Sequence, residues 1–473
     1  MADLKKALGP VQFFSLGFGS IVGVGWIVYM GLWFGQAGPI GTMLAFLIGG
    51  LLMSLVGLCY AELGSMYPVA GGEAVYGYRA FGQLASFVVG WAMVLMMTSV
   101  VPYVSISLAW LLDVLVPGVG GPVLYRWRGQ SIQALGLAIT VGWTLWLGIL
   151  NYRGIKGAAR FQDWLTYGKV LISVLFIGAA VFVGTTANLQ PLFQHGPDGS
   201  VVGGLLAVLA TTPFFFGGFN LIPQMFEERA EGTSPRILGL VVVFVILAAA
   251  AYYAIAAVSV GAVAPWQQIV KADLPAVAAF QTAFTSSWMA RVIVVVGLCG
   301  VVTVGNAASI GATRLLFALG RARMISPGFT ELHPVHGSPV KAIRFVIGFG
   351  LLGAFLGKGG IAPIVNVGSA AACLAYFFSS LAVWRLRAVE AEHPRPYRLP
   401  FAAVVSPVAA LGSLFLLWSA LRQHWVDAGG RFPLEWVVII VWAVLGGVLW
   451  SRARSARAVM APGEQRKIVL GEL

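Results

Sequence analysis

Two apolar stretches of the chain each gather residues that fit poorly in a helix, and the backbone there is the first candidate for chemistry. The stretch GFGSIVGVGWIV carries four glycines, namely Gly17, Gly19, Gly23 and Gly25. The later stretch TTPFFFGGFNLIP carries Pro213, Gly217, Gly218 and Pro223. Within a helix, glycine costs about 1 kcal/mol relative to alanine and proline about 3 kcal/mol. We therefore expect both stretches to leave the helical conformation partway along.

A helix interrupted in this way has unpaired backbone groups to offer a ligand. Nonhelical backbone in an apolar environment is tolerated where it is buried in protein or lines a cavity. Half-helix amino ends present N–H groups to an anion, and half-helix carboxyl ends present carbonyl oxygens to a cation. An amino acid carries both charges and suits both ends. The alternative is that the glycines let helices pack closely, but the recurrence of the pattern in a second stretch favours a binding site.

Two charged side chains, Lys169 and Arg314, fall within apolar stretches. Arg314 is about one or two turns from the end of its stretch, so its guanidinium can reach the interface. The ammonium of Lys169 either extends outward in the same way or stays buried. Burial disfavours the charged form of a lysine because that form loses hydration. A buried Lys169 is therefore a candidate to take up and release a proton.

Acidic and imidazole side chains lie at or beyond the ends of the apolar stretches. The five histidines all fall in expected loops: His195, His333, His336, His393 and His424. A membrane enzyme or a metal site needs such groups clustered around a cavity. The sequence therefore predicts no enzyme, no metal site and no cofactor.

The composition is that of a polytopic membrane protein. Of 473 residues, 59% are hydrophobic and 10% are charged, whereas soluble domains carry about 25% charged residues. The net charge of +13 lies in short connectors, as the positive-inside rule expects, so it does not indicate nucleic acid binding. The three cysteines fall in apolar stretches, which argues against a disulfide framework.

Twelve apolar stretches are long enough to be membrane spans. They cover 11–34, 40–66, 83–115, 132–150, 163–184, 201–225, 237–262, 288–318, 342–357, 361–384, 401–421 and 433–450. With both termini in the cytoplasm, most basic residues of the connectors also lie on that side. The two interrupted spans are then the first and the sixth. Interrupted spans at equivalent places in two inverted halves indicate a transporter's binding site.

The chain is also similar to members of the amino acid–polyamine–organocation (APC) superfamily of permeases. The similarity covers nearly the whole chain and rests on strings in the same order: GSIVGVGWIV, YAELGSMYPVAGGEAVYGYRAFG, FGGFNLIPQMFEER, NAASIGATRLLFALGRARMISP, HPVHGSPVKAI and HPRPYRLPF. The resemblance implies a LeuT-type fold, all-α and integral to the membrane, with twelve helices and alternating access. It divides a single transmembrane domain, 1–473, into repeat one (11–184), repeat two (201–384), two additional helices (401–450) and a cytoplasmic tail (451–473).

The resemblance further implies which groups bind a substrate. Its carboxylate would meet the N–H groups of Gly23, Val24 and Gly25. Its amino group would meet carbonyls in the first and sixth spans. Those carbonyls belong to Ile21 in the first span and to Phe214 and Gly217 in the sixth. The second broken segment runs from Phe214 to Gly218. The ring of Phe214 would close over the substrate as a gate.

Some positions depart from the family's pattern or extend it. Val24 replaces a small polar residue, so a hydroxyl contact is lost, and Trp26 replaces a small aliphatic residue and is expected to narrow the pocket as a gate. Asn220 stands where some relatives carry a glutamate for proton-linked exchange, and an amide does not titrate. Lys169 matches a lysine of proton-coupled relatives that occupies the place of sodium in sodium-coupled ones. Tyr103 is expected to line the pocket, although hydroxyls in spans also bond to their own helix.

The sequence thus predicts a secondary transporter for a small amino acid or related amine, driven by proton coupling. The alternatives are an exchanger without proton coupling, a channel, or a sensor that does not transport. The apolar and amide side chains of GFNLIPQ favour a neutral substrate. The expected partners are this small molecule, protons and membrane lipid, without nucleic acid, in a monomer or homodimer. The expected location is a prokaryotic inner membrane.

Overall fold

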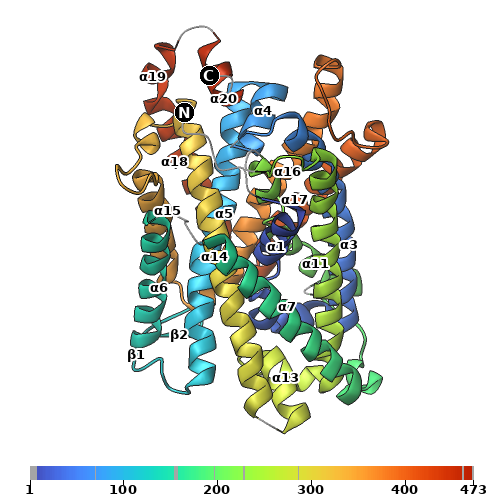
Figure 1. Cartoon of the computed structure of the whole chain (residues 1–473). Coiled ribbons are helices and arrows are strands. Elements are labelled where there is room, and N and C mark those ends of the chain that lie inside the picture. Colours follow the sequence, from blue (N-terminus) through green and yellow to red (C-terminus); the bar gives the residue numbers. More distant parts are fainter. Residues whose placement is uncertain are drawn as a thin grey trace.

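The computed structural model describes residues 8–69, 71–153, 158–196, 198–226, 229–285, 287–460 and 463–470. Helices make up most of these residues and stand side by side along the molecule (Figure 1). Helices α4 (Glu73–Phe81) and α20 (Glu464–Leu470) lie at one end, hereafter the α4/α20 end. The hairpin of β1 (Val123–Trp127) and β2 (Gln130–Gln133) lies with α13 (Pro275–Phe284) at the other end, hereafter the β1/α13 end.

Eleven helical segments of the described residues are long and apolar enough to cross a membrane. They are Pro10–Val28, Met30–Met66, Gln83–Leu115, Ala134–Tyr152, Asp163–Val183, Val201–Gln224, Pro235–Val263, Arg291–Arg321, Lys358–Val389, Ala402–Asp427 and Leu434–Arg452. The sequence predicts twelve, and the difference lies in the expected span 342–357. There the chain forms α15 (Val340–Ala354), with 15 residues. At about 1.5 Å per residue this helix is shorter than a hydrocarbon layer of roughly 30 Å.

Several of these segments consist of more than one element. The first holds α1 (Pro10–Ile21) and α2 (Gly25–Val28), and the sixth holds α8 (Val201–Leu209), α9 (Thr212–Phe216) and α10 (Leu221–Gln224). The other long helices are α3 (Met30–Met66), α5 (Gln83–Leu115), α6 (Ala134–Tyr152), α7 (Ala158–Val183), α11 (Pro235–Val263), α14 (Ser287–Arg321), α16 (Ile361–Val389), α17 (Ala402–Asp427) and α18 (Leu434–Arg452). The short elements are η1 (Thr186–Leu189), α12 (Trp266–Ile269), η3 (Pro327–Thr330), η4 (Lys358–Gly360) and α19 (Arg454–Ala458).

Small residues bring the central helices into close contact. Helix α3 packs along α11, and a Cβ atom on Gly50 would lie 2.3 Å from the Cβ atom of Ala250. A Cβ atom on Gly57 would lie 2.5 Å from Ile246. Helices in lipid gain little from hydrophobic burial against each other and are held by such close packing. Some glycines therefore do serve packing, as the alternative interpretation of the glycine-rich stretches supposes.

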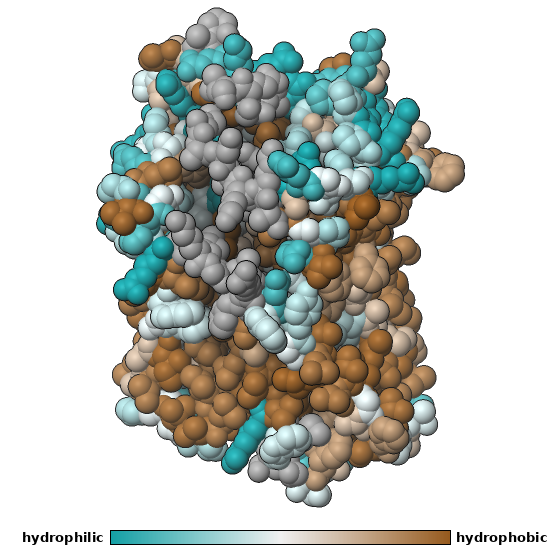
Figure 2. Space-filling model, viewed as in Figure 1, coloured by the Kyte–Doolittle hydropathy of each residue, from teal (hydrophilic) through white to brown (hydrophobic). Residues whose placement is uncertain are grey.

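The outer surface is apolar over much of its height. Figure 2 shows brown, hydrophobic residues over the lower part of the view, while teal residues gather toward the α4/α20 end. Phe182 is 90% exposed and Leu352 is 71% exposed. Large apolar side chains at this exposure suit contact with lipid. The protein is a multi-pass membrane protein.

Two connecting regions have more structure than the sequence predicts. The expected loop between the third and fourth spans contains the antiparallel β1–β2 hairpin. The expected tail, 451–473, contains α19 and α20. In α20 the amide of Gln465 donates to the carbonyl of Ala322 at 2.7 Å. This part of the tail therefore docks on the helices at the α4/α20 end.

Candidate functional site

The first span changes direction at its glycines. Helix α1 ends at Ile21 and α2 begins at Gly25, so residues 22–24 lie outside both helices. The N–H groups of Val24 and Gly25 have no hydrogen-bond acceptor among the described residues. All of this backbone is buried. It leaves donors directed into the protein interior without a partner, which is costly unless a ligand or water supplies an acceptor.

The sixth span is interrupted between α9 and α10. Gly218 has a φ of +127°, and a Cβ atom there would lie 2.8 Å from the side chain of Ser20. Both the backbone conformation and the close approach require glycine. The N–H of Gly218 donates to Oδ1 of Asn220 at 3.1 Å. The side chain of Asn220 thus holds the turn that separates α9 from α10.

The two interruptions lie against each other. Gly218 contacts Ser20 at the end of α1, and a Cβ atom on Gly25 would lie 2.5 Å from the ring of Phe215. The same position is 3.4 Å from the hydroxyl of Tyr103. That hydroxyl is buried and has no hydrogen-bond partner among the described residues. The structure therefore places Gly25 beside Phe215 and Tyr103, and Gly218 beside Ser20.

Two of the three carbonyls expected to receive an amine, those of Ile21 and Phe214, already have partners. The hydroxyl of Tyr253 donates to the carbonyl of Ile21 at 3.0 Å. The carbonyl of Phe214 accepts from the N–H of Gly217 at 3.1 Å. Each carbonyl oxygen has two lone pairs, so a second donor is compatible with both contacts.

Aromatic rings cover one side of the interruptions. The ring of Phe214 packs edge-on against Tyr103, with centroids 5.3 Å apart. The ring centroid of Phe215 lies 5.2 Å from that of Tyr29 and 4.9 Å from that of Trp33. The assignment of Phe214 as a gate stays a prediction, and the sequence analysis did not anticipate the position of Phe215 beside Gly25. The run of three phenylalanines at 214–216 contains no signal for which ring turns inward.

Trp26 lies away from these rings. It is 1% exposed, and its ring packs against Phe176 at 5.0 Å and Tyr252 at 6.2 Å. Those partners belong to α7 and α11. The structure therefore does not place Trp26 beside Phe214, and its side chain fills the space between α2, α7 and α11.

Lys169 points inward and is held by the first interruption. Its side chain is 1% exposed. Nζ donates to the carbonyl of Gly19 at 2.9 Å, to the hydroxyl of Thr303 at 3.0 Å and to the carbonyl of Val22. An ammonium group has three donors and no acceptor, so these three acceptors suit the charged form. Because Gly19 and Val22 stand at the carboxyl end of α1, the ammonium also complements the helix dipole there. Thr303 of α14 was not anticipated from the sequence.

The second interruption is tied to a buried acid. Glu73, the first residue of α4, is 0% exposed. Its carboxylate accepts from Nδ2 of Asn220 and from Nε2 of Gln224, both at 2.9 Å. Burial raises the pKa of Glu73 to about 7, although hydrogen bonds from these amides favour the charged form. In the sequence Glu73 is only one of the acids at or beyond the ends of the apolar stretches, and its contact with Asn220 was not predicted.

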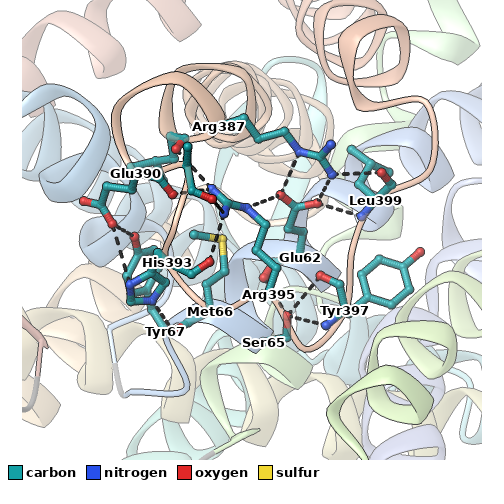
Figure 3. Close-up of polar contacts among 12 residues, drawn as sticks. Glu62, Ser65, Met66, Tyr67, Arg387, Glu390, His393, Arg395, Tyr397 and Leu399 are labelled. Atoms are coloured by element: carbon teal, nitrogen blue, oxygen red, sulfur yellow. Dashed lines mark hydrogen bonds and ion pairs between the residues drawn. The ribbon is translucent and has the colours of Figure 1, made fainter.

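A network of ion pairs and hydrogen bonds links the segments that carry Glu62 and Arg387, and Figure 3 shows its contacts. Glu62 is fully buried between Arg387 and Arg395. Arg387 donates to both of its oxygens, at 3.0 and 2.6 Å, and the N–H of Leu399 donates at 2.6 Å. The network joins α3 to α16 and to the segment before α17.

A second carboxylate extends the network. Glu390 accepts from the hydroxyl of Tyr67 at 2.6 Å and pairs with Arg79 of α4. Burial disfavours the charged form of Glu390, but the contacts with Tyr67 and Arg79 outweigh burial and hold the pKa of Glu390 below its usual value.

The other end of the molecule contains a large open cavity. Its volume is about 770 Å³, and it reaches from the β1/α13 end to Tyr29 and Thr211. These two residues stand close to the interruptions, four positions after Gly25 and three before Phe214. Charged side chains of both signs line the cavity: Arg128, Lys271, Asp273, Lys358, Asp427 and Glu435. Trp33 donates to the hydroxyl of Thr211 at 3.1 Å, beside the floor of the cavity.

The described residues include no cluster of three or more histidine, cysteine or acidic side chains suited to a metal ion. The three free cysteines, Cys59, Cys299 and Cys373, form no disulfide among these residues.

Comparison with known proteins gives a consistent picture. The model of a family described as "Amino acid permease" matches residues 8–449. The chain is similar to the branched-chain amino acid permease BcaP of Bacillus subtilis (strain 168), with 28% identity over 471 residues, or 96% of this chain and 94% of that protein. It is similar to the glutamate/serine transporter AimA of the same organism, with 26% identity over 93% of this chain and 80% of that protein. The methylthioribose transporter of that organism is 24% identical over 96% of this chain and 95% of that protein.

Proposed function

We propose that this chain, which belongs to the amino acid permease family, moves a neutral amino acid across a membrane by proton-coupled alternating access. The pair of adjacent, buried helix interruptions carries this proposal. Both leave backbone groups in the interior, and they meet where Gly218 contacts Ser20 and Gly25 contacts Phe215.

We assign the two ends of the substrate to different parts of this site. The free N–H groups of Val24 and Gly25, together with that of Gly23, suit a carboxylate. The carbonyls of Ile21 and Phe214, with that of Gly217, suit an ammonium group. The unpartnered hydroxyl of Tyr103 is available to either end. Such contacts recognise the part that amino acids share, and the rings of Phe214 and Phe215 favour an uncharged side chain.

The overall arrangement proposed is the LeuT-type fold. The interrupted spans are the first and the sixth in chain order, which suits two inverted repeats of five helices (11–184 and 201–384) followed by two more. In this arrangement α15 serves as a short ninth span, for a total of twelve. Both termini lie in the cytoplasm, and the membrane is a bacterial inner membrane. The bacterial relatives and the basic connectors support that placement.

In this orientation the cavity of about 770 Å³ opens outward and the ion-pair network closes the cytoplasmic end. The conformation is then one in which substrate enters from outside. Rings of Tyr29, Trp33 and Phe215 separate the cavity from the backbone of Gly25. Their displacement would admit the substrate.

We propose Lys169 as a proton carrier. Its three hydrogen-bond acceptors suit the charged form. Two of these acceptors are carbonyls of α1, so a movement of α1 during transport would remove them and favour the neutral amine, because an unpaired buried charge is costly. Proton release would in this way follow the movement of the substrate site.

Uptake of radiolabelled leucine, isoleucine and valine into proteoliposomes tests the proposal, with an imposed pH gradient and protonophore as the energetic control. Glutamate and methylthioribose serve as comparison substrates. The expected result is uptake of the neutral amino acids above their equilibrium level, abolished by protonophore. If a pH gradient does not drive accumulation of any of these compounds, the proposed coupling is wrong.

A paired substitution tests the site. In Gly25→Val the new Cβ atom would lie 2.5 Å from the ring of Phe215, before the rest of the valine side chain is considered. In Gly447→Val on α18 the new Cβ atom would have no neighbour within 4 Å. We expect Gly25→Val to abolish leucine binding and Gly447→Val to leave it unchanged. Equal affinity in both variants would contradict the assignment.

A further inference from the structure

The buried carboxylate of Glu73 has a role that the proposed substrate site and Lys169 do not account for. It lies outside the membrane spans, at the first position of α4, and none of its surface is exposed. Its two oxygens receive one hydrogen bond each from α10 and the residue before it, namely from Gln224 and Asn220. Glu73 is thus the link between α4 and the second half of the sixth span.

Close backbone approach makes this link specific. A Cβ atom on Gly72 would lie 2.6 Å from Cγ of Gln224. Gly72 also has a φ of +43°, which favours glycine. The glycine before Glu73 therefore lets the side chain of Gln224 cross the start of α4 and reach the carboxylate.

No positive charge neutralises Glu73 among the described residues. Arg79 on the same helix pairs with Glu390 instead. The groups that feel the charge of Glu73 are the hydroxyls of Tyr60 on α3, Tyr76 on α4 and Tyr376 on α16. All three hydroxyls are buried, and that of Tyr60 interacts with the carboxylate in a way that favours its charged form.

The remaining helices around α4 present mainly uncharged contacts to it. Ser86 of α5 donates to the carbonyl of Ala74 at 2.6 Å, and Leu319 of α14 lies with Ala74 around Gly90. Three charged side chains lie further along. Arg385 of α16 donates to the carbonyl of Ala80. Arg321 of α14 lines a small gap beside Ala74 and Val75, and Arg466 of α20 acts on Tyr78.

We propose that Glu73 is a proton-binding site of the transport cycle, whose charged form holds α10 against α4 and whose protonated form releases it. The proposal rests on the transport function proposed above. Hydrogen bonds to a charged carboxylate are about twice as strong as neutral ones, so a proton weakens both contacts with α10 at once. It also removes the cost of keeping an unpaired charge buried. The pKa of about 7 for Glu73 puts this change within the range of cytoplasmic pH.

The orientation of Asn220 connects this event to the interruption. Its Oδ1 atom is fixed by the N–H of Gly218, so its Nδ2 atom must face Glu73. A change at Glu73 therefore reaches Gly218 through one side chain. In the proposed orientation, protonation from the cytoplasm favours opening of the cytoplasmic end.

The first experiment measures protonation directly. Infrared titration of the full-length protein in lipid follows the carbonyl band of protonated carboxyls between pH 5 and pH 9, and Glu73→Gln identifies the contribution of Glu73. We expect a midpoint near 7. Gln224→Leu removes one donor to the charged form, so it should raise this midpoint. A midpoint at or below the ordinary value of 4.5, or no effect of Gln224→Leu, would overturn the proposal.

The second experiment measures release of α10 by hydrogen–deuterium exchange at one fixed pH of 8. Glu73→Gln mimics the protonated carboxyl, because glutamine keeps an acceptor for Asn220 but carries no charge. We expect exchange of the peptide covering α10 to be about three- to tenfold faster than in the wild type. Glu331→Gln, an exposed acid, is the matched control and should not change it. Unchanged exchange in Glu73→Gln would refute the release step.

Neither measurement uses a substrate, so both remain decisive if leucine is not the transported compound. If Glu73→Gln does not fold, the titrations of the wild type and Gln224→Leu still test the proton site. Exchange of α10 in Gln224→Leu then tests the release.

Discussion

Breaking the pair between Glu62 and Arg387 should destabilise the packing at the α4/α20 end by an amount that can be derived from the contacts of both side chains. Glu62 has no exposed surface and receives hydrogen bonds from Arg387 and from the N–H of Leu399, with Arg395 beside it. Replacing Glu62 with Ala leaves two guanidinium groups without their carboxylate. Removing one partner of a buried ion pair costs about 3–5 kcal/mol.

The cost for Arg387 should be smaller. Its side chain is 26% exposed, and Arg395 and Leu399 still hold the carboxylate after it is removed. Each hydrogen bond to a charged group contributes about 1.5–3 kcal/mol, and partial exposure reduces this. We therefore expect Arg387→Met to cost roughly 2 kcal/mol and the pair to show a coupling energy of about 1–3 kcal/mol.

A double-mutant cycle measures this coupling. The four proteins (wild type, Glu62→Ala, Arg387→Met and the double variant) are unfolded at equilibrium in mixed micelles. The matched control is the pair of Glu331 and Lys341, with side chains 66% and 51% exposed and 3.1 Å between the charged atoms. Exposed pairs contribute about 0–1 kcal/mol. If the coupling between Glu62 and Arg387 is no larger than that of the control pair, the buried network does not hold this end together.

Three further predictions address other parts of the structure. Lys169→Met should abolish accumulation of substrate driven by a pH gradient while downhill uptake persists, measured in proteoliposomes; normal accumulation would rule out the proton role. Gly218→Ala should lower both the stability and the substrate affinity, because φ is +127° and Ser20 lies 2.8 Å from the new Cβ atom. The control Gly178→Ala meets nothing within 4 Å and should affect neither. Thermal unfolding with and without leucine measures both effects. The pKa of Glu390 is held below its ordinary value of 4.5, so its contacts stabilise the fold above that pH. This stabilisation is lost as the pH falls through the lower folded-state pKa. Glu390→Gln should flatten this part of the profile of stability against pH, and an unchanged profile would contradict the assignment.

Local features of the chain predict the helix interruptions and the lysine within an apolar stretch. The free-energy cost of glycine or proline in a helix, or of a charge in an apolar stretch, depends on that residue and its neighbours. Gly23 and Gly25 follow the end of α1, and Gly217 stands directly after α9. Lys169 is recognisable as a charge in an apolar stretch, and the structure directs it into the protein at the end of α1. In both cases a few neighbouring residues contain the relevant information.

Contacts between distant segments were not predictable in the same way. Glu73 and Asn220 are 147 positions apart, and Glu62 and Arg387 are 325 positions apart. Glu62 lies close to the end of α3 and Glu73 is the first residue of α4. At the ends of helices a solvated charge is the ordinary expectation. Their burial depends on which helices pack together. The position of Phe215 beside Gly25 likewise depends on the rotation of α9, and three adjacent phenylalanines do not reveal it.

The side-chain amide of Asn220 is occupied at both of its ends, by the N–H of Gly218 and by the carboxylate of Glu73. A planar amide cannot turn toward one of these groups without losing the other. A ligand beside Gly218 and a proton on Glu73 therefore compete or cooperate through the same group. Thermodynamic reciprocity then requires that the factor by which a proton changes ligand affinity equals the factor by which the ligand changes proton affinity. Proton uptake or release on adding ligand at constant pH would thus report the sign of the coupling in a single calorimetric measurement.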